Sequence, residues 1–134
     1  MLLQTRLYPD MFPLVKQVQI ASDITRRGIA KLACVEVDEV DDNELSFGQL
    51  AARFMVNIDC LNVFNPSQIN GIESSIIEIP IKGQTISIDG QSFLLYFVLP
   101  NVFFHVTTLY SILRHCGVKL GKINFLGQPP TPAS

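Results

Sequence analysis

The sequence predicts an all-α antiparallel helical bundle that carries one short β-hairpin. Apolar residues recur at helical spacing in three long segments, residues 11–32, 46–62 and 89–117. Between the second and third segments, isoleucines alternate with other residues over 77–88, which is the period of a β-strand. This order places the hairpin between the last two helices.

The first helical segment carries a start signal and an internal glycine. Asp10 is predicted to cap a helix that begins at Met11, with Pro13 tolerated in the first turn, where backbone N–H groups have no intrahelical partner. Gly28 costs a helix about 1 kcal/mol relative to alanine. We therefore expect it where a neighbouring helix approaches closely.

The later elements carry comparable local signals. Ser46 and Gln49 match a capping box at the start of the second helix. Lys82-Gly83 allows the hairpin turn, and Asp89 opens the last helix. Pro100 is predicted to kink or break that helix, and Gly117 is predicted to follow its last residue.

Length and composition indicate one soluble domain. The 134 residues predict a single domain over 1–127 and a disordered, proline-rich tail over 128–134. Only 16% of the residues are charged, against about 25% in a typical domain. More surface than usual must therefore be covered by internal packing or by a partner chain. The net charge of −2 gives no electrostatic basis for nucleic-acid binding.

The cysteines and the hydropathy pattern predict a cytoplasmic protein. Cys34, Cys60 and Cys116 are odd in number and widely spaced, which favours reduced, mostly buried thiols. The densest apolar run, 93–99, is far shorter than the roughly 20 residues that span a bilayer. The N-terminal residues do not resemble a secretory signal, and we expect no membrane association.

Two acidic features are predicted to face solvent. The run EVDEVDDNE, residues 36–44, reads as a solvated linker, with a cation-binding loop as the alternative. Asp23 in the first helix is expected to be a solvent-facing carboxylate, with a general base as the alternative.

A candidate pocket lies on the last helix. Asn101 and His105 are one turn apart on a face of otherwise apolar side chains, so both are expected to point into the interior. Buried polar groups need partners, and convergent polar groups in an apolar setting mark a candidate site. Tyr110 is most simply a core residue, although its hydroxyl could also reach the pocket. This pattern does not define a reaction.

Three segments resemble a known family. PDMFPLVKQVQIASD (9–23), LPNVFFHVTTLYSILRHCGV (99–118) and GKINFLG (121–127) are similar to an uncharacterised domain-of-unknown-function family in the DinB/YfiT-like superfamily of metal-dependent enzymes. The resemblance implies a four-helix bundle with a pocket at one end. Many relatives hold a divalent metal there with three histidines. His105 then takes one ligand position, Asn101 stands at a second, and Gln17 or Gln19 lies near the third.

The departures from the three-histidine pattern change the expected chemistry. One imidazole and two neutral amides form a weak ligand set for a borderline metal such as zinc. We therefore expect no cofactor, and a polar pocket in which Gln17, Asn101 and His105 hydrogen-bond each other, a water or a small ligand. If a divalent metal were bound, these three residues would be its ligands.

The resemblance leaves two functions open. One is a metal-free protein that binds a small ligand or forms a structural dimer, and the other is a metal-dependent hydrolase or thiol transferase. Family members also begin with an additional amphipathic helix, and the first of the usual four helices is expected to be missing here. Its absence would expose apolar helix faces, so we predict a homodimer.

Overall fold

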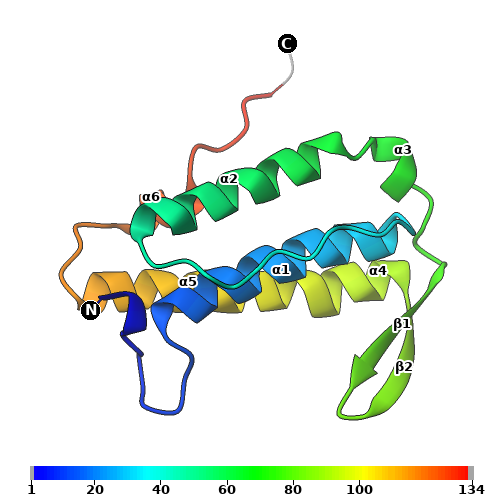
Figure 1. Cartoon of the computed structure of the whole chain (residues 1–134). Helices are drawn as coiled ribbons and strands as arrows, with labels where there is room; N and C mark the ends of the chain where they lie inside the picture. Colours follow the sequence, from blue (N-terminus) through cyan, green and yellow to red (C-terminus); the bar gives the residue numbers. More distant parts are fainter. Residues whose placement is uncertain (1, 133–134) are drawn as a thin grey trace.

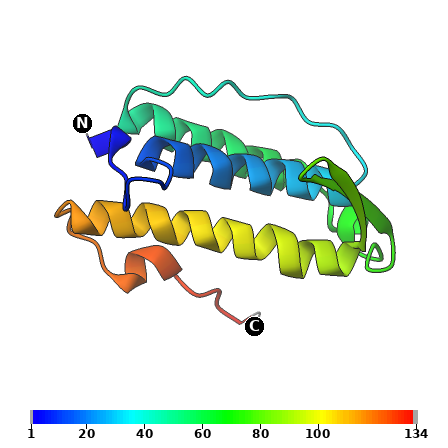
Figure 2. The ribbon, with the colours of Figure 1, turned by 90° about the horizontal axis from the view of Figure 1, so that it is seen from below.

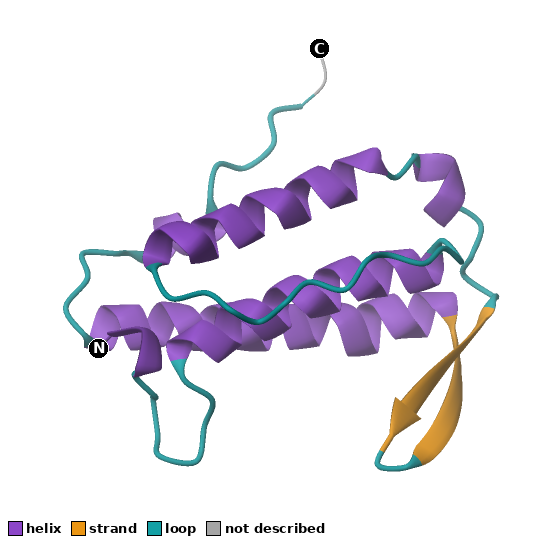
Figure 3. Ribbon diagram, viewed as in Figure 1, coloured by secondary structure: helices purple, strands orange, loops and turns teal. Residues whose placement is uncertain are grey.

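The computed structural model describes residues 2–132 and shows three long helices lying side by side (Figure 1). They are α1 (Leu14–Leu32), α2 (Phe47–Val63) and α5 (Leu99–His115). Helix α1 packs against both α2 and α5, and Figure 2 shows α5 on the other side of α1 from α2. The antiparallel hairpin β1 (Ile76–Ile81) and β2 (Gln84–Asp89) stands at one end of this bundle (Figure 3).

Shorter helical pieces complete the chain. They are η1 (Leu2–Gln4), α3 (Pro66–Ile69), α4 (Gly90–Ser92), the π-helical η2 (Phe93–Val98) and α6 (Lys122–Leu126). The predicted helical bundle with a hairpin before the last long helix is confirmed. The predicted tail, 128–134, lies partly outside the described residues, at 133–134.

The predicted start of the first helix is wrong. Helix α1 begins at Leu14 rather than Met11, and Asp10 does not cap it, because the residue at the cap position is Pro13 in an extended conformation. A residue that precedes proline is sterically driven out of the α region, which keeps Phe12 from being helical. The helix can therefore begin only after the proline.

The second helix begins as predicted. The Ser46 hydroxyl oxygen accepts a hydrogen bond from the backbone N–H of Gln49 at 3.1 Å. The side-chain oxygen of Gln49 accepts in return from the backbone N–H of Leu45 at 2.6 Å, one residue earlier than in a capping box. Two free N–H groups at this helix end are thus satisfied.

The hairpin also follows its sequence signals. Ile79 lies opposite Ile86, and the inward-facing Ile77 and Ile79 are buried. Lys82 and Gly83 both have positive φ, 49° and 77°, as the tight turn between two strands requires.

Helices α4, η2 and α5 form one continuous helix, Gly90–His115, so Pro100 does not break it. The distortion takes the form of the π-helical turn η2 immediately before the proline. A π turn widens the helix and shifts the carbonyl with which the proline ring would otherwise clash. The helix ends at His115, and Gly117, with φ of +89°, follows the cap residue Cys116 as predicted.

The core has two parts, one at each end of the bundle. The first comprises Leu3, Leu14, Val15, Val18, Leu50 and Ile112. The second comprises Leu32, Ile77, Ile79, Phe93 and Val98. A Cβ atom added to Gly28 would lie 2.9 Å from the Cγ2 atom of Val98, which confirms the predicted close approach.

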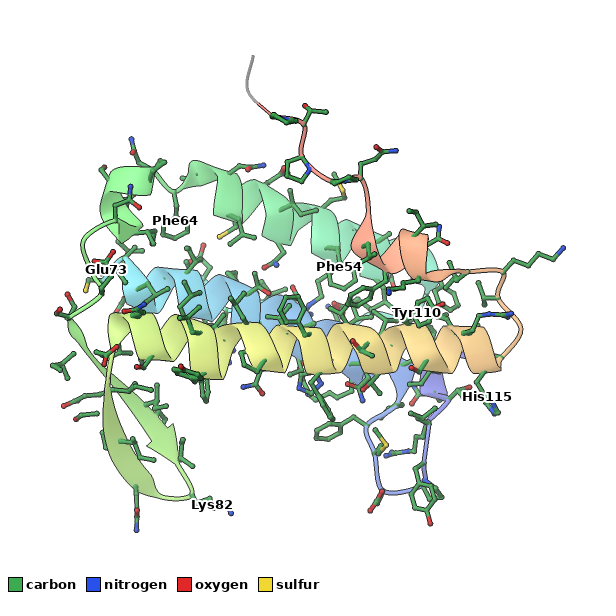
Figure 4. The ribbon with its side chains drawn as sticks, turned by 180° about the vertical axis from the view of Figure 1, so that it is seen from behind. Phe54, Phe64, Glu73, Lys82, Tyr110 and His115 are labelled. Atoms are coloured by element: carbon green, nitrogen blue, oxygen red, sulfur yellow. The ribbon has the colours of Figure 1, made fainter. Side chains whose placement is uncertain are left out.

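Large apolar side chains are exposed along α2 and the last helix. The most exposed are Phe47, Met55, Val56, Ile58, Val63, Leu95, Tyr96, Phe103 and Phe104. The helical spacing predicts an apolar stripe on α2, made of Phe47, Leu50, Ala51, Phe54, Ile58 and Leu61. Of these residues, only Leu50 is fully buried. Figure 4 shows the face that carries Phe54 of α2 and Tyr110 of the last helix.

The prediction that the thiols are mostly buried is wrong. Cys34 and Cys116 are exposed and Cys60 is partly buried, so the thiols are not mostly buried, although all three are unpaired.

The helix Gly90–His115 has 26 residues and a window of mean hydropathy 1.5, so by length and composition alone it could cross a membrane. This is weak evidence, since the core helix of a soluble protein passes the same test, but only 22% of that window is buried here.

Candidate functional site

Gln17 of α1 and His105 of the last helix meet in the interior. The Nδ1 atom of His105 lies 2.6 Å from the Oε1 atom of Gln17, and both residues are buried. The Gln17 amide nitrogen donates to the carbonyl oxygen of Phe12 at 3.1 Å, which fixes the orientation of the amide. Because the Gln17 oxygen can only accept, Nδ1 carries the proton. Burial lowers the pKa of His105 and favours this neutral form.

The other predicted pocket residues point elsewhere. The Asn101 amide donates to the carbonyl oxygen of Phe97, one turn earlier on its own helix, at 2.6 Å. The Gln19 amide donates to Glu44 at 3.3 Å. Tyr110 is half-buried and packs edge-on against Phe125 of α6, with ring centroids 6.4 Å apart. Of the predicted set, the hydrogen bonds therefore join only Gln17 and His105.

These residues do not fit a divalent metal. Gln17 and Asn101 are neutral amides, and one nitrogen of the single imidazole of His105 is already taken up by Gln17. Within residues 2–132, no group of three or more His, Cys, Asp or Glu side chains is placed to hold a metal ion. A neutral set of this kind binds zinc-like metals weakly.

A buried charged cluster lies instead between α1 and α2, centred on Arg53. The Arg53 side chain is 3% exposed. One terminal nitrogen donates to Glu44 at 2.6 Å and to the carbonyl oxygen of Asp41 at 3.0 Å. The other lies 2.8 Å from Asp23 and 3.0 Å from Asp42.

Asp23 and Glu44 are not the solvent-facing carboxylates that the sequence predicts. Their side chains are 18% and 6% exposed, and Asp23 also accepts from Arg26 at 3.1 Å. The reason is the path of residues 36–44, which we name the acidic strap. It runs back along α1 and α2 (Figure 1), where most of its residues are exposed as predicted while it delivers acceptors to Arg53.

The bonds within the cluster favour the charged forms of Glu44 and Arg53. Burial alone raises the pKa of Glu44, but hydrogen bonds from Arg53 and Gln19 outweigh burial and bring this pKa below its ordinary value of 4.5. Burial alone lowers the pKa of Arg53, and the bonds to Glu44 and Asp23 more than reverse that effect.

A cavity of about 480 Å³ lies beneath the acidic strap. Four of its lining side chains are at least nine-tenths buried, namely Ser22, Arg26, Arg53 and Asn57. Each has a side-chain atom with no hydrogen-bond partner among residues 2–132. The unpartnered atoms are Ser22 Oγ, Arg26 Nε and Nη2, Arg53 Nε and Asn57 Oδ1. Buried polar atoms are normally paired, so this concentration of unpaired ones is unusual.

Sequence reasoning missed this site, although a signal was available. Ser22 and Arg26 are one helical turn apart, as are Arg53 and Asn57. Arg53 also lies three residues from the buried Leu50, which places it on the inward face of α2. An arginine on a buried helix face requires carboxylate partners, and the acidic strap carries several of them close to α2 in the sequence.

A second cavity of about 520 Å³ lies between α1, β1 and η2. Apolar side chains such as Ile24, Ile79, Phe93 and Val98 dominate its inner wall. Unlike the cavity beneath the strap, it is not lined by any of the unpartnered buried polar atoms found within residues 2–132.

The fold defines the class of protein. Three packed helices with a hairpin before the last one form a DinB-like bundle, and the chain is similar to a solved DinB family member protein from Shewanella denitrificans. The two are 34% identical, with a TM-score of 0.87 over 99% of this chain and 75% of that chain.

The family follows from the sequence match. The model described as "Domain of unknown function (DUF1993)" matches residues 1–126, so the chain belongs to this uncharacterised family within the DinB-like superfamily. No curated protein matches the sequence. The predicted family resemblance is thereby confirmed, but the family description names no reaction.

Proposed function

We propose that this protein binds a small polar molecule in the cavity beneath the acidic strap. The supporting observation is the set of buried, unpartnered polar atoms on Ser22, Arg26, Arg53 and Asn57 around one cavity of about 480 Å³. Leaving a buried polar group unpaired costs about 1–3 kcal/mol. A ligand that pairs these atoms recovers that free energy on binding.

The proposal assigns Gln17 and His105 a structural role. Their hydrogen bond and the bond from Gln17 to Phe12 satisfy the buried amide without any ligand. We further propose that the protein carries no resident metal, because this donor set is a poor one. Elemental analysis of protein purified without chelator tests this, and stoichiometric zinc, nickel or manganese would favour the metal-dependent hydrolase or thiol transferase instead.

We propose a homodimer in the cytoplasm as the working form. Apolar side chains such as Met55, Ile58 and Phe103 are exposed on α2 and on the last helix, and burying them against another chain would be favourable. A second copy of the chain would cover it without any other partner. Light scattering at micromolar concentration tests this, and a clean monomer would contradict the dimer.

Native mass spectrometry of protein purified under mild conditions tests the ligand proposal. We expect a non-covalent small-molecule adduct that disappears in Ala52→Trp, because Ala52 is an exposed residue lining the cavity, where a tryptophan fills the space. The matched control is Ala51→Trp, next to it on α2, exposed and outside the cavity lining. An adduct that survives equally in both variants would place the ligand elsewhere.

A further inference from the structure

We infer that the ligand is a small organic carboxylate with a neighbouring hydroxyl or amino group, and that Arg26 binds its carboxylate. This inference rests on the proposed function, because it names the chemical class of the molecule in the same cavity.

One side of the Arg26 guanidinium group is free to bind a ligand. Its Nη1 atom donates to Asp23 at 3.1 Å, whereas Nε and Nη2 have no partner among residues 2–132. These two nitrogens form one side of the planar guanidinium, and their N–H bonds point in parallel. Two parallel N–H bonds match the two oxygens of a carboxylate. At neutral pH a carboxylate is therefore the strongest hydrogen-bond partner for this side of Arg26.

The inventory of unpaired atoms adds a second requirement. The unpaired nitrogens of Arg26 and Arg53 can only donate, and the Ser22 hydroxyl donates or accepts. Asn57 Oδ1 is the one unpaired atom of this set that can only accept. A complementary ligand is therefore rich in acceptor oxygens and carries one O–H or N–H group for Asn57.

The charge distribution also favours an anion at Arg26 rather than at Arg53. Arg53 is surrounded by the carboxylates of Asp23, Asp42 and Glu44. Arg26 shares only Asp23, through one of its nitrogens. The least compensated positive charge in the cluster thus lies on the side of Arg26 where Nε and Nη2 are unpaired.

The rest of the cavity suggests an apolar body on the ligand. Val40, Ala52 and Val56 line it beside the polar groups. The unpaired atoms themselves have almost no solvent exposure, so the groups around them must shift to admit a ligand and then close over it. Ion pairs to Lys16, Arg27 and Arg53 hold the acidic strap, and we expect it to open in local fluctuations.

The test uses three probes of similar size in calorimetric titrations of the full chain. Mandelate offers a carboxylate, a hydroxyl and a phenyl ring, mandelamide replaces the carboxylate by a neutral amide, and phenylacetate lacks the hydroxyl. We expect mandelate to bind at least tenfold more tightly than either of the others. Equal binding of mandelate and mandelamide would overturn the carboxylate assignment while leaving a ligand-binding cavity in place. If none of the three binds at millimolar concentration, the inferred ligand class is wrong. The proposal that the cavity binds a small molecule is tested separately, by the adduct in native mass spectrometry.

Three variants separate binding from folding. Arg26→Lys removes the two parallel N–H groups of Nε and Nη2 and is expected to weaken mandelate binding at least tenfold. Arg27→Lys, one residue away and exposed, is the control. Ser22→Ala and Asn57→Leu remove unpaired buried atoms, so the free protein keeps or gains stability in urea while mandelate affinity falls. If both variants bind mandelate as the parent does, Ser22 and Asn57 do not contact the ligand and the inference fails.

Discussion

Replacing Arg53 by methionine should strongly destabilise the fold. The substitution keeps much of the apolar stem of the side chain but removes the charge that faces Asp23 and Glu44. Those carboxylates are 18% and 6% exposed, and they accept from Arg53 at 2.8 and 2.6 Å. Removing one partner of a buried ion pair leaves an uncompensated charge and costs about 3–5 kcal/mol.

Urea unfolding followed by circular dichroism measures the effect. With a slope of about 1.5 kcal/mol per molar urea for a chain of this size, the loss lowers the unfolding midpoint by about 2–3 M. The matched control is Arg27→Met, which removes a pair with Glu39 in which the side chains are 53% and 79% exposed. An exposed pair is worth about 0–1 kcal/mol.

The pH dependence adds an internal check on the same variant. Because the pKa of Glu44 is lowered in the folded state, its contribution is fully present above the ordinary value of 4.5 and is lost as the pH falls through the lower folded value. The stability gap between the parent and Arg53→Met should therefore narrow in acid. An Arg53→Met variant that loses no more than Arg27→Met near pH 7, or a gap that stays constant in acid, would refute the reasoning.

Three further outcomes are expected. Gly90→Ala places a Cβ atom 2.2 Å from the carbonyl oxygen of Ile72, so it should lower the thermal midpoint sharply, whereas Gly48→Ala, with nothing nearer than 3.8 Å, should not. Burial lowers the pKa of His105 in the folded state, so as the pH falls below 6.5 the unfolded chain takes up a proton before the folded chain does. The urea midpoint of the parent should therefore fall in this pH range, whereas that of His105→Asn should not. Amide hydrogen exchange should be faster in α2 than in α5, and equal protection of the two helices would contradict the packing described above.

The local features of the fold could be predicted because their signals lie within a few residues. Ser46 and Asp89 accept hydrogen bonds from N–H groups three residues ahead, and Gly117 ends the last helix by its own conformation. The start of α1 was predicted wrongly because two local rules compete there. The cap signal at Asp10 loses to the constraint that Pro13 imposes on the residue before it.

The charged cluster could not be predicted in the same way, because its pairs are distant in sequence. Asp23 and Arg53 are 30 residues apart, and no periodic pattern links them. The path of the acidic strap follows its bonds to the buried Arg53, whose burial was not predicted from the sequence. The candidate site shifted for the same reason, since the amide and imidazole at Gln17 and His105 form a closed pair while the unpaired groups lie between α1 and α2.

The packing of α2 connects this cluster to ligand binding. The last helix packs on α1 through the close approach of Val98 of η2 to Gly28, whereas two of the three buried residues of α2, Arg53 and Asn57, are polar. Helix α2 is therefore held largely by directional polar interactions with α1 and the acidic strap, which weaken steeply when their geometry changes. A ligand in the cavity would touch both helices and the strap, because all three line it, and a ligand that binds only the closed arrangement stabilises that arrangement by mass action. A ligand that pairs the free atoms of both helices would add to the bonds that already hold α2 against α1, so occupancy of the cavity and rigidity of α2 should rise together.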